Sequence, residues 1–387
     1  MSLGSPISPR RVCGLLCALA ALLAPLDAAS ADEVSARPAP RASRSGEGAE
    51  AHAGQHPSPG RRALAATAAI VPGAVVHGAG HWVLGRRQTA SRLLTLEGIG
   101  LGTFLAGGVP IVLSGASRYL VAPSAALVVA GLGLFGAGLY GDLYGVLRPE
   151  GSVGRPARSA PLLETQVGGL YVYDPQFPQR AYATQGLDLW LGSWRLSPRG
   201  YFAVDSPATR VRAVGAHRLH GPTRSGSARD GSFLDLELGA THWQQPSEAF
   251  RTTTLEGAAS GRIDGVRFDR ALGGSFAELA LGAGLHVAGY ASGTPSDAEG
   301  LLLMRFGYGF YFGDVATTGG EAMAYYDHRH DDLAAGILIP GLGSGVAGHF
   351  GLRTRAYWGE LGAELLLEAG AAYVAGLSLC YRQGQQP

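Results

Sequence analysis

Residues 372–381 read AYVAGLSLCY, a stretch in which apolar side chains alternate with mostly small or polar ones. Side chains of a β-strand point alternately to the two faces of its sheet, so this spacing puts the apolar residues on one face and ends that face on an aromatic ring. The stretch therefore predicts a strand with one strongly apolar face. That face carries Tyr373, Ala375, Leu377, Leu379 and Tyr381, and the other carries Val374, Gly376, Ser378 and Cys380.

Earlier segments of the chain repeat this period of two, with turn-rich stretches such as residues 221–231 and 292–297 between them. Repeated short alternating segments are typical of antiparallel barrels. We therefore expect a mainly β fold over residues 162–382, an antiparallel transmembrane β-barrel of roughly ten strands, with 8–12 allowed. The clearest segments are residues 187–191, 234–241, 278–287, 305–312, 350–358 and 360–368.

The composition favours a protein that presents apolar surface to lipid. Only 16% of the 387 residues are charged, and glycine is abundant at 60 residues without a collagen-like period. Soluble domains carry roughly a quarter of charged residues. The formal net charge of +1 gives no electrostatic reason to expect nucleic acid as a partner.

The N-terminus has the pattern of an export signal. Arg10-Arg11 precedes a mostly apolar run from Val12 to Leu26, and Ala29-Ser30-Ala31 fits the cleavage rule, which makes residues 1–31 a signal peptide. Residues 32–62 are rich in Ala, Pro, Ser, Arg and Gly, and we expect a disordered linker there. Cys380 is then the one cysteine of the mature chain, so no intramolecular disulfide is expected.

Residues 63–148 form a glycine-rich apolar unit that is predicted to be helical. Two stretches, Leu93 to Ser114 and Tyr119 to Val146, are each near the length of a membrane-crossing helix. They are expected to pair as a hairpin, with glycines such as Gly98 and Gly133 lining the contact between them. Residues 149–161 are expected to be a second linker.

The C-terminal half resembles the small outer-membrane β-barrel proteins of Gram-negative bacteria. The resemblance lies in the alternation, in the terminal strand and in aromatic strand ends. It implies export to the outer membrane and contact with membrane lipid. The aromatic residues concerned are Trp190, Trp194, Trp243, Tyr311, Trp358 and Tyr381.

Charged residues on the strand face opposite the apolar side chains are the main candidate site. An arginine facing lipid near the membrane midplane would cost about 2–4 kcal/mol, so these charges should face the lumen. A barrel of about ten strands has a narrow lumen, which such side chains would fill as ion pairs. The predicted lumen network consists of Asp235, Glu237, Glu278, Arg305, Arg353, Arg355, Glu360, Glu364 and Glu368.

Two histidine pairs are weaker candidates, both as metal ligands. His77 and His81 are four apart, which would place them on one face of a helix, although Gly78 rules out the zinc-protease motif. His328 and His330 belong to the acidic run 327–332, which could bind a divalent cation. The alternatives are a polar helix end or loop for the first pair and a solvated strand end with paired charges for the second. No cofactor is expected.

Three functions remain open at this stage. The first is a non-enzymatic outer-membrane protein, structural or surface-exposed, with a largely plugged lumen. The second is a narrow passive channel for small solutes. The third is a periplasmic β-domain anchored to the inner membrane by the helical hairpin. No serine has a Gly-x-Ser-x-Gly setting, which argues against a barrel enzyme, and the sequence does not identify a protein partner.

Overall fold

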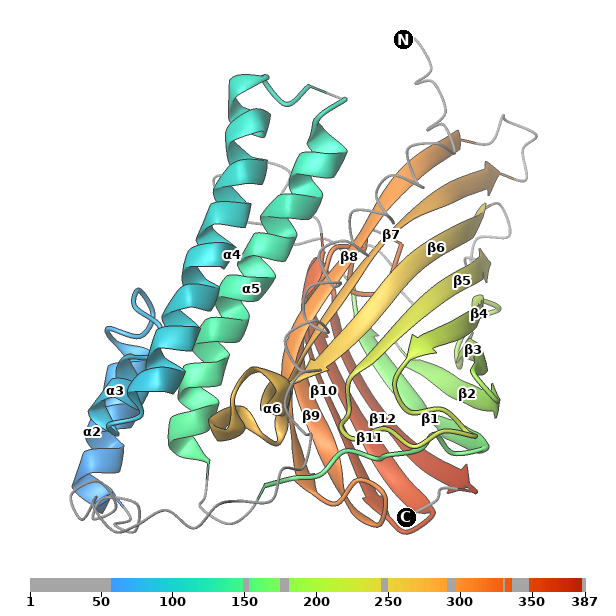
Figure 1. Cartoon of the computed structure of the whole chain (residues 1–387). Helices are drawn as coiled ribbons and strands as arrows, with labels where there is room; N and C mark the ends of the chain where they lie inside the picture. The colour runs from blue at the N-terminus through green and yellow to red at the C-terminus, as the bar shows by residue number, and fades with distance from the viewer. Residues whose placement is uncertain are drawn as a thin grey trace, which may run out of the picture.

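The computed structural model describes residues 57–117, 119–148, 153–174, 181–244, 250–290, 297–329, 331–335 and 348–384. The expected signal peptide and most of the first expected linker lie outside these residues. The described chain forms a helical unit beside a closed β-barrel (Figure 1). The helices are α2 (Pro59–Ile70), α3 (Ala79–Val83), α4 (Arg87–Leu113) and α5 (Val121–Leu147), with α6 (Gly265–Phe268) and the 3-10 helix η2 (Arg270–Leu272) in a loop of the barrel.

Twelve antiparallel strands close the barrel, each bonded to its neighbours in sequence, and β1 pairs with β12. Closure leaves no open sheet edge, as a membrane-spanning sheet requires. The predicted fold class is confirmed, at the upper end of the expected strand range. The strands are β1 (Leu163–Tyr173), β2 (Ala181–Leu191), β3 (Trp194–Ala203), β4 (Thr209–His220), β5 (Phe233–Gln244), β6 (Phe250–Asp264), β7 (Ser275–Tyr290), β8 (Asp297–Gly313), β9 (Thr318–Asp327), β10 (His349–Trp358), β11 (Leu361–Ala369) and β12 (Tyr373–Gln383).

Alternation along β12 sets the two faces of the wall as the sequence predicted. Leu377 and Leu379 are 63% and 73% exposed on the outside, whereas Ser378 and Cys380 are buried on the inside. The terminal end of the barrel is defined here as the end that holds Leu163 and Gln383, which pair across the closing seam.

Aromatic side chains mark both ends of the outer face. Trp194, Trp358 and Tyr381 lie near the terminal end, and Tyr171 and Tyr373 lie near the opposite end. Bands of this kind flank the lipid-facing belt of transmembrane barrels. The other expected strand-end aromatics differ, because Trp190, Trp243 and Tyr311 have inward parity and contact arginines of the interior.

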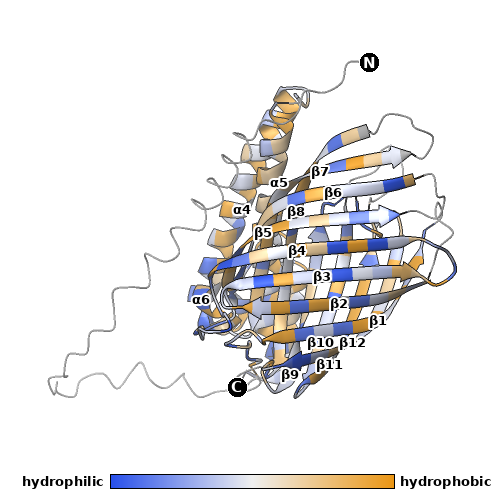
Figure 2. Ribbon diagram, turned by 90° about the vertical axis from the view of Figure 1, so that its right-hand side faces the viewer, coloured by the Kyte–Doolittle hydropathy of each residue, from blue (hydrophilic) through white to orange (hydrophobic). Residues whose placement is uncertain are grey.

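The helical unit packs against the outside of the barrel wall, along β7 and β8 (Figure 1). Ala126 and Val129 of α5 share an apolar cluster with Leu281 and Met304, both on the outer face. Further along α5, Tyr140 stacks on Tyr308 with ring centroids 5.9 Å apart. Both long helices are apolar along their length (Figure 2) and each is long enough to cross a membrane. The barrel wall and the hairpin therefore lie side by side.

Glycines do line the contact between α4 and α5, but they are not the predicted ones. A Cβ on Gly100 would lie 2.7 Å from the backbone nitrogen of Phe135, and one on Gly131 would lie 2.4 Å from that of Phe104. The prediction for Gly98 is wrong, since a Cβ there meets nothing within 4 Å. Gly133 faces the barrel rather than α4, against Phe306. The sequence shows small residues but not which helix face each glycine takes.

The described part of the second expected linker is packed rather than loose. Gly154 lies so close to Tyr311 that a side chain would collide with its carbonyl group. Arg155 forms a bridge with Asp314, and Ala160 is buried. This segment therefore crosses the terminal end of the barrel before β1 begins.

The helix contact predicts a matched pair of variants. Gly100→Leu should destabilise the helical unit by about 1–3 kcal/mol, because its side chain overlaps the backbone of α5. Gly98→Leu should leave stability nearly unchanged, because its side chain points into open space. Proteolytic susceptibility of the α4–α5 hairpin in detergent would measure this, with heat-modifiable gel migration as the check that the barrel is intact. Equal effects of the two variants would contradict the assignment.

Candidate functional site in the barrel interior

The barrel interior is lined by charged side chains that the strand parity turns inward. Of the nine residues predicted for the lumen network, eight have this parity: Asp235, Glu237, Glu278, Arg305, Arg353, Arg355, Glu364 and Glu368. The ninth is a correction. Glu360 lies in the β10–β11 turn, is exposed, and accepts a hydrogen bond from the Tyr381 hydroxyl at 3.2 Å. The alternation of inward and outward side chains along β11 starts at Leu361, so it does not extend to Glu360.

Arg355 is the centre of the predicted cross-strand pairing. It stands opposite Glu364 in the β10–β11 register and donates a hydrogen bond from Nε to that carboxylate. Its Nη1 also lies 3.6 Å from Glu164 of β1. Glu364 in turn accepts from Gln166 at 2.6 Å. The group joins β10, β11 and β1 across the closing seam.

A second group surrounds Arg262 of β6, which the sequence did not single out. Its guanidinium pairs with Glu278 at 2.5 Å and with Glu321 at 2.7 Å. It also lies 3.7 Å from the ring centroid of Phe276, so a cation–π contact covers one face. Arg262 faces inward, but β6 lacks a clear apolar alternation in the sequence. Its inward orientation could therefore not be predicted.

The acidic residues of β5 pair with arginines of neighbouring strands. Arg218 makes a two-pronged contact with Asp235, with distances of 2.7 and 2.9 Å. Arg195 Nη2 lies 3.1 Å from Glu237 Oε1. Glu368, at the opposite end, accepts a hydrogen bond from the Tyr325 hydroxyl at 2.6 Å. Asp235 and Glu237 are therefore matched by arginines, whereas the buried Arg305 Nε has no hydrogen-bond partner among the described residues.

An apolar layer closes the interior near the terminal end. Phe276 and Met323 are almost fully buried there. The packed segment before β1 adds Ala157 to this layer. Arg382 covers it by donating to the carbonyl oxygens of Ala316 and Gly359, at 3.0 and 2.9 Å. The buried members of the layer are Phe276, Tyr311, Val315, Met323, Tyr357 and Cys380.

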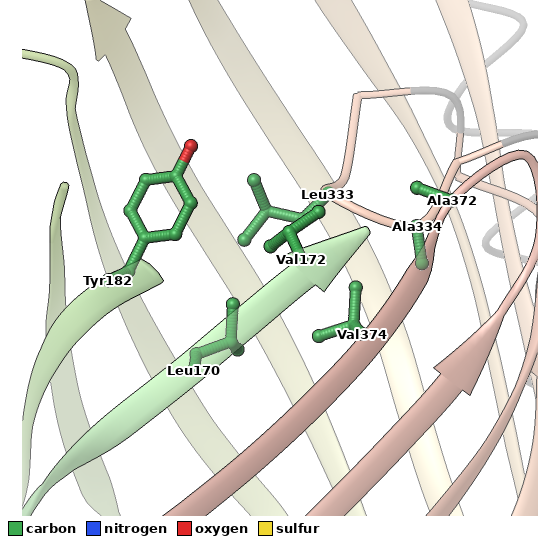
Figure 3. Close-up of a cluster of buried hydrophobic side chains, with 7 residues drawn as sticks. All are labelled: Leu170, Val172, Tyr182, Leu333, Ala334, Ala372 and Val374. Atoms are coloured by element: carbon green, nitrogen blue, oxygen red, sulfur yellow. The ribbon is translucent and has the colours of Figure 1, made fainter. Parts of the chain in front are cut away.

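At the opposite end, the segment after β9 folds into the barrel. Its Ala334 has no exposed surface, and Leu333 lies beside it among inward side chains of β1, β2 and β12 (Figure 3). Arg210 reaches this segment and pairs with Asp332 at 2.5 Å. We call residues 331–335 the inner loop. The apolar cluster that holds it consists of Leu170, Val172, Tyr182, Ala372 and Val374.

Charge pairing holds the base of the inner loop. Arg329 binds Glu256 of β6 at 2.5 Å and Asp331 at 3.0 Å. Burial alone would raise the pKa of Asp331, but the Arg329 guanidinium holds that pKa below its ordinary value. Burial opposes ionisation of Asp332 in the same way, and Arg210 keeps its pKa well below the usual range. Both carboxylates are therefore charged at neutral pH.

A small cavity lies among the interior side chains of the described strands. One cavity of about 60 Å³ lies against β1, β2, β3, β11 and β12, lined by Gln166, Arg199, Glu364 and Ser378 among others. A water molecule needs about 10–15 Å³ measured in the same way, so the cavity accommodates a few waters. It is polar, and it is far smaller than the pockets of ~300–1,000 Å³ that hold small-molecule ligands.

The predicted metal ligands occupy different settings. His77 and His81 are fully buried in the helical unit, where their rings fill notches at Gly138 and Gly145 of α5. Glu97 accepts from the backbone of His77 at 2.8 Å. His77 precedes α3 and His81 lies within it, so the two histidines do not share one face of a helix. Asp142 likewise accepts from three backbone N–H groups, those of Gly78, Gly80 and His81.

The second histidine pair is split by the boundary of the described residues. His328 Nδ1 lies 3.0 Å from the Tyr326 hydroxyl, whereas His330 is outside the described residues. Asp331 and Asp332 of the acidic run pair with Arg329 and Arg210 inside the barrel rather than lying solvated at a strand end. Among the residues that the structure describes, no three His, Cys, Asp or Glu side chains form a group that could hold a metal ion.

Comparisons with known proteins give similarity of shape alone. No protein-family model matches the chain, and no curated protein matches it in sequence. Omp33 of Acinetobacter baumannii aligns at 12% identity and a TM-score of 0.27, over 57% of this chain and 98% of that one. The translocator domain of the autotransporter NalP from Neisseria meningitidis aligns at 12% identity and a TM-score of 0.33, over 58% and 89%. The class is set by this chain's own closed barrel with its apolar outer face, the architecture of transmembrane β-barrels.

The charge group around Arg355 at the closing seam predicts a large effect of removing this arginine. Arg355→Ala should lower the free energy of unfolding by about 3–5 kcal/mol, because two buried carboxylates lose their partner. Urea unfolding in detergent micelles, followed by tryptophan fluorescence, would measure it. The control is Glu360→Gln in the adjacent turn, where an exposed charge should contribute at most about 1 kcal/mol. A stability unchanged by Arg355→Ala would mean that this face is solvated.

The inner loop predicts a specific response to acid. Because the folded pKa values of Asp331 and Asp332 are depressed, their stabilisation is complete above the unfolded value of about 3.9 and is lost as the pH falls further. His349, 3.5 Å from Glu368, faces Asp332 and gains a favourable charge in acid. The loop should therefore stay docked from about pH 7 to about pH 4.

Thiol labelling of an Ala334→Cys variant would follow this docking. Labelling should be slow across that range and should accelerate only below it, relative to the parent protein, whose Cys380 is buried. Acceleration near pH 6.5 would instead assign control of the loop to a histidine.

Proposed function

We propose that this protein is an outer-membrane β-barrel with a closed lumen, which serves a structural or surface-exposed role and is not an enzyme. The observation that supports the proposal is that described side chains occupy the interior at three levels. An apolar layer lies at the terminal end, charge pairs such as Arg212 with Glu256 lie further along the strands, and the inner loop lies at the opposite end. Interiors of this kind suit a rigid barrel rather than passage of solutes.

The placement of the helical unit supports one shared membrane for helices and strands. Tyr144 and Arg148, at the end of α5, both donate to the carbonyl oxygen of Gly273, at 3.2 and 2.8 Å. Arg92 of α4 binds Asp269 in the same loop at 3.2 Å. An inner-membrane anchor with a separate periplasmic domain would leave the outer faces of β7 and β8 free of helices. The packing favours the outer-membrane alternative.

The narrow channel remains the competing function, and electrical recording distinguishes it. In planar lipid bilayers the protein should show no steady open level, because paired charges and the inner loop occupy the lumen. Arg210→Ala should introduce transient openings, since Asp332 then loses its ion pair. The control is Arg251→Ala, which removes an exposed arginine of β6 from the outer face. A stable open level in the unaltered protein would establish the channel instead.

A further inference from the structure

Arginines gather where the helical hairpin reaches the terminal end of the barrel. α4 begins at Arg87, directly after Arg86, and α5 ends next to Arg148. Arg86 is close enough to Arg62 and Arg148 for their like charges to repel it. We call the exposed or carbonyl-bound members of this group the arginine cluster, which consists of Arg61, Arg86, Arg87, Arg92 and Arg148.

Several of these guanidinium groups are fixed by neutral partners. Arg61 donates from Nε to the carbonyl oxygen of Val83 at 2.9 Å, and Arg86 donates from Nη1 to that of Gly145 at 2.9 Å. Arg148 holds the carbonyl oxygen of Gly273 in the same manner. A carbonyl oxygen orients a guanidinium without cancelling its charge. The side chains are thus held in place while the positive charge persists.

Within the described part of the chain, carboxylates balance the cluster only in part. Among the described residues, Asp269 is the acidic side chain that forms an ion pair with a member of it, Arg92. Arg87 makes the imbalance greater, because it occupies the first turn of α4, where the helix dipole is already positive and no acidic residue is present. The described residues therefore carry a surplus of fixed positive charge at this end, which favours an anionic partner.

The position of the cluster identifies the partner. Arg87 is exposed at the beginning of α4, and the next exposed apolar residues of that helix, Leu94 and Ile99, belong to a span long and apolar enough to cross a membrane. The charges therefore lie at the boundary between lipid tails and water. Basic groups beside transmembrane helices at this depth bind anionic headgroups.

We propose that the arginine cluster binds the phosphate headgroups of anionic phospholipids in the leaflet at the terminal end of the barrel. The lipid tails then lie against the exposed apolar face of α4. The inference rests on the membrane placement of the proposed function but not on a closed lumen, so conductance measurements do not bear on it.

Native mass spectrometry of the full chain in detergent would test the proposal. Phosphatidylglycerol and phosphatidylethanolamine with identical tails are offered separately, and phosphatidylglycerol should bind at least about tenfold more tightly. Each arginine near a membrane surface contributes enough to change affinity about fivefold, so Arg86→Gln with Arg148→Gln should weaken phosphatidylglycerol binding about 25-fold. Arg251→Gln, at the other end of the barrel, should leave it unchanged.

Two measurements keep the test independent of how the variants fold. Raising the salt concentration should reduce the preference of the unaltered protein for phosphatidylglycerol, as expected for charges at a surface. Excess inorganic phosphate should fail to displace the lipid, because it lacks the tails that α4 contacts. Equal binding of the two lipids, unweakened binding by the double variant, or full displacement by inorganic phosphate would each overturn the proposal.

Discussion

Pairing of every strand with two neighbours is the constraint on which the rest of this structure depends. Lipid offers no hydrogen bonds to a backbone, so a sheet that spans it must close, as β1 and β12 do here. Once the sheet is closed, each side chain faces either lipid or the interior. Charged side chains such as Arg262 and Glu321 then face the interior, because lipid does not solvate them. In the interior they pair with opposite charges. The charge pairs of the interior therefore follow from closure and from alternation.

The same constraint explains what sequence reasoning could predict. Parity is a local property, so Arg355 and Glu364 could be assigned to one face and to neighbouring strands from their own hairpin. Glu360 was misplaced because a turn interrupts parity within a single residue. The pairings of Arg355 with Glu164 and of Arg210 with Asp332 join segments far apart in the chain. Such contacts depend on the closing register and on the path of a loop, which no local pattern encodes.

The helical unit shows a second limit of prediction from sequence, which concerns the orientation of helix faces. Its length and apolarity were evident, and the structure has two helices of 27 residues each. Helix faces were not evident, because glycine is frequent on several sides of both helices. Gly100 touches the partner helix, Gly98 faces outward, and Gly133 touches the barrel. The three glycines differ because the hairpin also packs against β7 and β8 of the barrel wall. No pattern in the sequence predicts that contact.

That wall has a particular position in the ring. In a circle of twelve strands, β7 lies six places from β1, so the hairpin covers the side of the barrel diametrically opposite the seam between the first and last strands. Packing of the helices on the wall and closure of the ring at the seam are thereby separated in space. The contacts of α5 with β7 and β8 involve no strand of the seam, so pairing of β1 with β12 does not depend on them directly. The covered side can thus serve as a fixed scaffold against which the free edges find each other.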